Sequence, residues 1–247
     1  VDVTRVEVLA GRWGYAAVAN ASGFLQVIER CPVVRSLVAR PGWLAACLAG
    51  AGAGRVRAFD LVEGFVRFAD PATDPAWADV ALALHERHTA TGDRALLQQH
   101  MRRSGLLAWP AEDRFMFIHP AVQAYFAAEA LARRGDTPSD IAALTADPWW
   151  DAVAILAVGH LEPHRAEALC RAMGEAGRLS LQALCLAEMQ SPPADFVRDT
   201  IRALLDTMGR GDDVDDRQAA IGVASLTGGE PVRRTGQIGP CLWVLEH

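Results

Sequence analysis

The spacing of hydrophobic positions between residues 104 and 134 predicts a helix end, a small β-hairpin and a further helix. Aromatic and β-branched residues are concentrated in residues 114–118, as in a strand, and the turn-rich stretch 109–113 predicts the hairpin turn. Pro120 then stands where the first residue of a helix would. Apolar residues follow it with helical spacing: Val122, Tyr125, Phe126 and Ala130. This pattern places His119 between a strand and the N-terminus of a helix.

Elsewhere apolar residues recur mostly every three or four positions, which predicts helices. The predicted helices cover residues 24–38, 40–48, 59–68, 77–88, 93–104, 139–146, 149–158, 165–176, 179–188 and 195–208, with one amphipathic turn at 218–226. Residues 1–10 alternate between apolar and polar and predict a short strand at most. The clearest boundary is the stretch 70–75, which holds two prolines. After residue 136 helices follow one another without strands, which is typical of HEAT-like or armadillo-like helical pairs.

The predicted fold is therefore mainly α, in four regions. Residues 1–70 form a small helical domain with the possible N-terminal strand, and residues 71–135 form a winged-helix module with a small β-hairpin. Residues 136–208 form a helical-repeat-like sensor region, and residues 209–247 form a linker or the edge of a following domain. The chain opens without an initiator methionine or a leader sequence, so we expect a piece of a longer cytoplasmic protein.

Charge and composition exclude several classes of function. The net charge of −6 argues against nucleic acid or an anionic membrane as a partner, and no apolar run reaches the length of a membrane span. All 24 basic residues are arginine, so the chain holds neither the lysine of a Walker A phosphate loop nor one for Schiff-base chemistry. It also shows no nucleophile–base pair and no carboxylate dyad. We predict no catalysis by this chain alone.

Three other patterns of chemically active residues have simpler interpretations. The glycines of residues 50–54 follow a predicted helix, without a Lys-Ser/Thr pair, so a flexible loop is favoured over a phosphate loop. His85 and His88 are three positions apart on a helix, but the residues between them complete no metal ligand set, and we predict no metal site. The five cysteines are far apart and mostly among apolar helical residues, which predicts buried free thiols in a reducing compartment.

Two segments resemble parts of the NACHT-type STAND nucleotide switches. Gly105-Leu106-Leu107, the run 115–119 and the run 123–128 match in order and spacing the signature that closes their winged-helix module. Residues 147–159 resemble the segment that follows this module, and residues 40–48 resemble a segment of their small helical domain.

The resemblance implies two residues that contact the nucleotide. His119 matches the histidine that touches the β-phosphate of bound ADP, and Pro41 matches a proline that lies against the adenine. The residues alone also allow a histidine that only satisfies a strand end, and a proline that only begins a helix.

The function implied is that of the regulatory and sensor part of a NACHT-like STAND ATPase. Its cofactor would be ADP or ATP, with Mg²⁺ in the parent protein. Its partners would be an upstream P-loop domain and, on activation, another protein or further copies of itself. One alternative is a nucleotide-independent helical scaffold that binds proteins. A winged-helix DNA-binding regulator is disfavoured, because residues 71–135 carry seven arginines against seven acidic residues and the helix 121–132 is largely apolar.

Overall fold

The computed structural model describes residues 27, 32–38, 43, 47, 56–71, 74–99, 101–208 and 213–227. Within these ranges the protein is mainly helical and holds a three-stranded antiparallel sheet, which confirms the predicted fold class. The predicted strand at residues 1–10, the glycine-rich loop at 50–54 and Pro41 lie outside the described residues. Of the predicted helix 40–48, the structure describes only Trp43 and Cys47.

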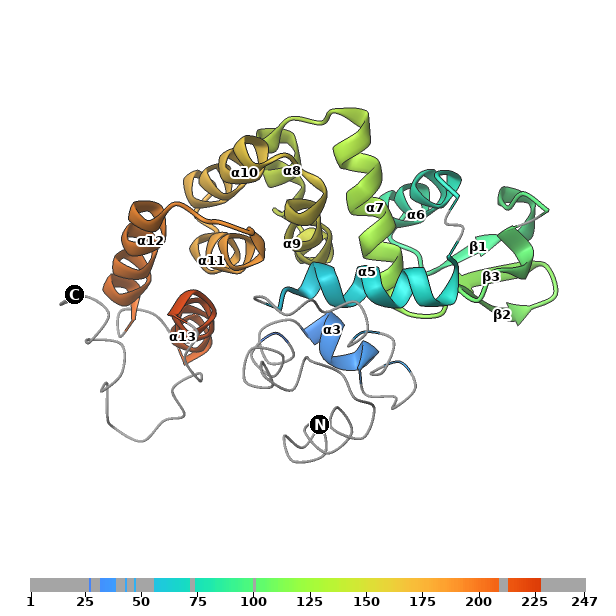
Figure 1. Ribbon diagram of the computed structural model, residues 1–247, viewed down its shortest axis with the longest axis horizontal. Helices are drawn as coiled ribbons and strands as arrows, with labels where there is room; N and C mark the ends of the chain where they lie inside the picture. The colour runs from blue at the N-terminus through green and yellow to red at the C-terminus, as the bar shows by residue number, and fades with distance from the viewer. Residues whose placement is uncertain are drawn as a thin grey trace.

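The elements follow one another along the chain as helices interrupted by one sheet (Figure 1). The α-helices are α3 (Pro32–Leu37), α5 (Ala58–Ala69), α6 (Ala76–Glu86), α7 (Pro120–Arg134), α8 (Pro138–Leu144), α9 (Asp151–His160), α10 (Pro163–Glu175), α11 (Leu179–Glu188), α12 (Ala194–Thr207) and α13 (Asp213–Thr227). The strands are β1 (Thr91–Asp93), β2 (Leu107–Ala111) and β3 (Arg114–Phe117). Short 3-10 turns are η2 (Arg94–Leu96), η3 (Met101–Arg103) and η4 (Pro148–Trp150).

Helix α7 is the centre of the fold. It packs against α6 on one side and α9 on the other, and α5 crosses it near its N-terminal end (Figure 1). Its alanine-rich sequence lets these helices approach closely, and most of its residues are buried. Pro120 occupies the first turn, where its missing N–H costs nothing, and Gly135 ends the helix with a φ of 78°. Residues far apart in the sequence are thus brought to one helix.

The sheet is larger than the predicted hairpin. Strands β2 and β3 form the hairpin as expected, and β1 pairs with the other side of β3, giving the order β1-β3-β2. The prediction of a helix over residues 93–104 is wrong, because this stretch holds the end of β1 and two 3-10 turns. Gly92 allows the close pairing just before this stretch, because a Cβ there would lie 2.7 Å from the Phe115 ring of β3. Sheet pairing overrides the helical spacing of the apolar residues.

From α8 to α13 each helix packs on neighbours close to it in the sequence, as expected for stacked helical pairs. The observed bounds agree with the predicted ones to within about two residues at most ends, and for α11 they agree at both ends. The single turn predicted at 218–226 is part of a longer helix, α13, which packs on α11 and α12. This part of the region 209–247 therefore belongs to the helical array.

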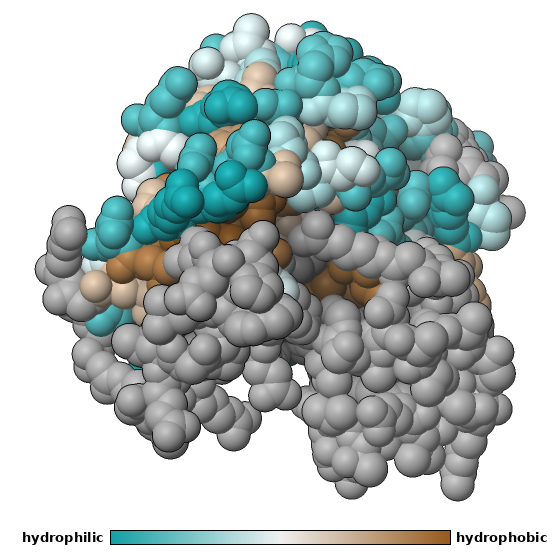
Figure 2. Space-filling view, turned by 60° about the vertical axis from the view of Figure 1, so that its left-hand side comes forward, coloured by the Kyte–Doolittle hydropathy of each residue, from teal (hydrophilic) through white to brown (hydrophobic). Residues whose placement is uncertain are grey.

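The visible surface divides into two zones of hydropathy. Hydrophilic residues cover the upper part of the described surface, and apolar residues gather in a band below them (Figure 2). Large side chains that stand out into solvent include Phe68, which is 69 % exposed, and Trp109, which is 39 % exposed. Among the helices that the structure describes, none is both long and apolar enough to span a bilayer.

Candidate functional site

His119 lies at the junction of β3 and α7. Its backbone is extended, and its Nδ1 accepts a hydrogen bond from the Ala121 N–H over 3.1 Å, so His119 caps the N-terminus of α7. On the strand side, the Ile118 N–H donates to the Leu106 carbonyl over 2.9 Å and fixes the end of the hairpin. The predicted place of His119, between a strand and a helix N-terminus, is confirmed.

The other ring nitrogen of His119 reaches the N-terminal part of the chain. Its Nε2 lies 2.9 Å from the Ser36 Oγ of α3, 83 positions away in the sequence. The Trp43 ring meets the imidazole edge-on at 6.0 Å and also packs against Phe65 of α5 at 5.2 Å. His119 is only 8 % exposed, so it joins three separate segments at a buried point. No sequence pattern indicates Ser36, because its partner lies so far along the chain.

These contacts indicate which ring nitrogen of a neutral His119 carries the proton. Because Nδ1 accepts a backbone N–H, the ring proton of a neutral His119 is on Nε2, which donates to the Ser36 hydroxyl. An anion near this nitrogen would gain a directed N–H donor close to a helix N-terminus, where the helix dipole favours negative charge. Such a ligand would have to replace the Ser36 Oγ at Nε2.

His85 lies in α6, whereas His88 lies two residues beyond the end of that helix with a φ of 51°, so the two are not on one helix as predicted. Both contact residues around η4. The Nε2 of His85 bonds the Trp149 carbonyl at 3.1 Å, and the His85 ring stacks on Trp149 at 4.8 Å. Burial lowers the pKa of His85 to about 4. The Nε2 of His88 contacts Asp147 Oδ2 at 2.6 Å. Within the described ranges, no three His, Cys, Asp or Glu side chains are grouped so that they could hold a metal ion.

Thiol chemistry is blocked at the three cysteines in the described part of the chain. Cys47, Cys170 and Cys185 are buried free thiols, as the sequence predicts for these positions. Burial raises the pKa of Cys47 and of Cys170 to about 12, and that of Cys185 lies well above its ordinary value. A thiolate nucleophile at neutral pH is therefore not available from these residues.

The region 71–135 offers little to a DNA duplex. Helix α7 has ten buried residues, so it is not exposed to enter a groove. Arginines around the module are paired with acids: Arg114 with Asp93, Arg133 with Asp79, and Arg134 with Glu86. An open cavity of about 680 Å³ lies beside the turn of the hairpin. It is lined by residues of both charges: Asp93, Arg94, Ala95, Arg102, Glu112 and Asp113. This distribution does not favour a polyanion.

Comparison with protein-family models, with curated proteins and with solved structures found no match.

Proposed function

We propose that this chain is the regulatory part of a nucleotide-dependent switch of the STAND type. In this proposal the region around α3, α7 and the hairpin closes over ADP that is bound by an upstream P-loop domain of the same cytoplasmic protein. That domain supplies the lysine and the Mg²⁺ site. Exchange of ADP for ATP releases the module and allows contact with a protein partner or self-assembly.

The observation that carries the proposal is the placement of His119. A buried imidazole stands at the N-terminus of a helix, with its donor nitrogen directed away from its own helix toward α3. A cap alone uses only Nδ1, and in this conformation the second nitrogen contacts a different segment of the chain. Ser36 holds this contact here, and a phosphate oxygen of ADP would take its place. Pro41 as the adenine contact stays part of the proposal on resemblance alone.

A nucleotide-independent scaffold is the second candidate. The exposed aromatic side chains of Phe68 in α5, Trp109 in β2 and Trp149 in η4 favour it, since exposed aromatic residues are typical anchors of protein interfaces. The two candidates differ in one observable, which is whether the parent protein requires a nucleotide.

The first step is to check the coding region upstream of Val1 for a P-loop. The test is then the variant His119→Asn in the intact protein. Asparagine keeps an acceptor for the Ala121 N–H but loses the donor at Nε2. Loss of one hydrogen bond to a charged phosphate should weaken ADP binding by roughly tenfold to a hundredfold and raise the population of the open, self-associating form. Calorimetry with ADP and light scattering measure the two effects.

Ser36→Ala is the matched control, because it removes the competing contact and leaves the cap of α7 in place. We expect ADP binding to be unchanged or slightly tighter in this variant. Unchanged ADP affinity and oligomeric state in His119→Asn, or absence of an upstream P-loop, would contradict the switch and favour the scaffold.

A further inference from the structure

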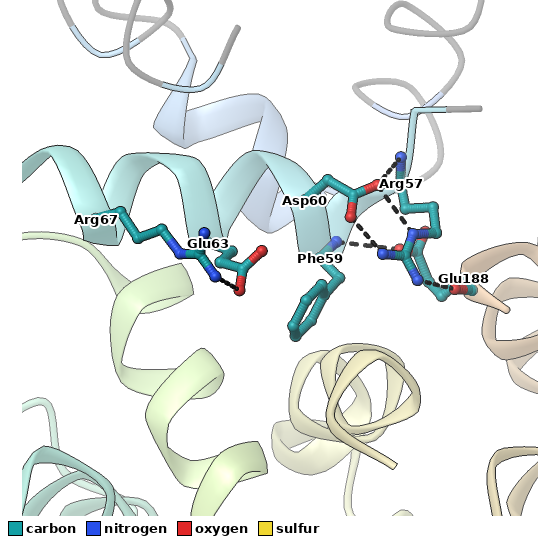
Figure 3. Close-up of polar contacts among 6 residues, drawn as sticks. All are labelled: Arg57, Phe59, Asp60, Glu63, Arg67 and Glu188. Atoms are coloured by element: carbon teal, nitrogen blue, oxygen red, sulfur yellow. Dashed lines mark hydrogen bonds and ion pairs between the residues drawn. The ribbon is translucent and has the colours of Figure 1, made fainter. Parts of the chain in front are cut away.

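Two helix ends that are distant in the sequence meet head to tail in the structure. The N-terminus of α5 lies against the C-terminus of α11, where Glu188 is the last helical residue (Figure 3). The Glu188 Oε2 accepts from the Phe59 N–H over 3.1 Å, across 129 positions of sequence. In return, Arg57 Nη1 donates to the Glu188 carbonyl over 3.2 Å. Each helix end therefore supplies the hydrogen-bonding group that the other lacks.

Glu188 is an unfavourable residue for its own helix. A negative charge at a helix C-terminus is unfavourable in the field of the helix dipole. Glu188 is also only 1 % exposed, so its carboxylate is largely removed from water. Two groups at the start of α5 contribute to offsetting both effects: the Phe59 N–H at the positive end of that helix, and the guanidinium of Arg57. Residues that break a local rule in this way are expected where a contact has a function.

The start of α5 depends on Glu188 in turn. Arg57 stands at the N-cap, and an arginine side chain has no acceptor to offer the first N–H groups of a helix. Asp60 accepts from the Arg57 N–H over 3.2 Å and pairs with its guanidinium, so this carboxylate is occupied within α5. The Phe59 N–H takes its acceptor from α11 instead.

Phe59 fixes the position of this helix end. Its ring lies 5.5 Å from the Tyr125 ring of α7 and 4.8 Å from the His160 ring of α9. Gly159 leaves the necessary space, because a Cβ there would lie 2.1 Å from the Phe59 ring. The Phe59 ring thus packs between α7 and α9, and the two hydrogen bonds with Glu188 hold the same helix end.

We propose that the contact of Glu188 with Arg57 and the start of α5 is a latch that holds α5 against the helical array and can open without unfolding the array. When α5 leaves, the Glu188 carboxylate gains water, so the open state does not keep a buried charge without a partner. Opening would also move Phe65, against which Trp43 packs, and so loosen the segment that contacts His119. This last link, to nucleotide release, rests on the proposed function.

Hydrogen exchange on the full chain tests the latch in Glu188→Ala. We expect the amides of the first turn of α5 to exchange roughly tenfold to a hundredfold faster, which corresponds to loss of a hydrogen bond to a charged group. The amides of α10 and α12 should keep their protection. Glu63→Ala is the matched control, because Glu63 is an acid of α5 that pairs with Arg67 of the same helix over 2.8 Å (Figure 3).

Glu188→Gln gives a second, milder variant, since it keeps an acceptor for the Phe59 N–H and removes the charge. An intermediate increase in exchange at α5 supports the latch. Unchanged exchange at α5 in both variants would overturn it, and so would an equal loss of protection in α10 and α12, which marks an ordinary structural contact. Faster exchange at α5 with ADP binding unaltered in the intact protein would keep the latch and contradict only its link to nucleotide release; the switch itself is tested by His119→Asn.

Discussion

Acidification from pH 7 to pH 4 should lower the free energy of unfolding, with the largest single contribution from His160. Burial against Phe59 and Tyr125 lowers the pKa of His160 to about 4, although a backbone hydrogen bond with Tyr125 acts in the opposite direction. In the unfolded chain its pKa is about 6.5. Between these values the unfolded state binds a proton that the folded state does not, so the loss begins near pH 6.5 and ends near pH 4.

This difference is worth about 3 kcal/mol for His160. His85 acts in the same direction. Its neighbours Trp149 and His88 are exposed and let water screen the charge, so His85 contributes about 2 kcal/mol to the loss of free energy of unfolding. Burial raises the pKa of Glu129 and of Asp151, and these carboxyl groups oppose the loss as they take up protons. The net change is therefore smaller than the sum for the two histidines.

His160→Phe isolates the effect, because phenylalanine keeps a ring between Phe59 and Tyr125 and removes the titrating group. Urea unfolding measures the free energy of unfolding at pH 7 and at pH 4. Its decrease between these two pH values should be smaller by about 3 kcal/mol in this variant than in the unchanged protein. Equal losses in both proteins would show that His160 takes up its proton at an ordinary pKa in the folded state.

Trp77→Ala should cost about 3–5 kcal/mol of folding free energy, a large share of the stability of a typical domain. Trp77 is 1 % exposed, and its ring lies 5.8 Å from Phe117 and 6.2 Å from Phe126. Truncation would leave a cavity where α6, β3 and α7 meet. Chemical denaturation followed by far-ultraviolet circular dichroism measures the loss without relying on tryptophan fluorescence.

Trp77→Phe is the informative comparison. The Trp77 Nε1 is buried and finds no hydrogen-bond partner among the described residues. Phenylalanine removes this unsatisfied donor, which offsets part of the packing that is lost, so we expect a change of about 1 kcal/mol or less. If Trp77→Phe were as damaging as Trp77→Ala, the indole N–H would have to be satisfied in the folded protein.

The periodicity of apolar residues was a good guide where a helix packs on neighbours close in the sequence. In α11 the predicted and observed bounds coincide, because a buried apolar face and local hydrogen bonds decide the same structure. Residues 93–104 show where this fails. Leu97 and Met101 have helical spacing and both are buried, yet Leu97 ends one 3-10 turn and Met101 begins another. Spacing reports which residues become buried, not which partner buries them.

In the candidate site, too, the sequence predicted the local features and missed the contacts between distant segments. A strand followed by a proline was enough to place His119 at a helix N-terminus, because capping depends on residues within one turn. Its contact with Ser36 and the pairing of Glu188 with the start of α5 could not be foreseen, since each joins segments many residues apart. The sequence by itself thus determined most of the described helices, the hairpin and the position of the histidine. Only the tertiary structure decided which helix ends meet, because polar groups at helix ends take whatever partner the packing of apolar faces brings to them.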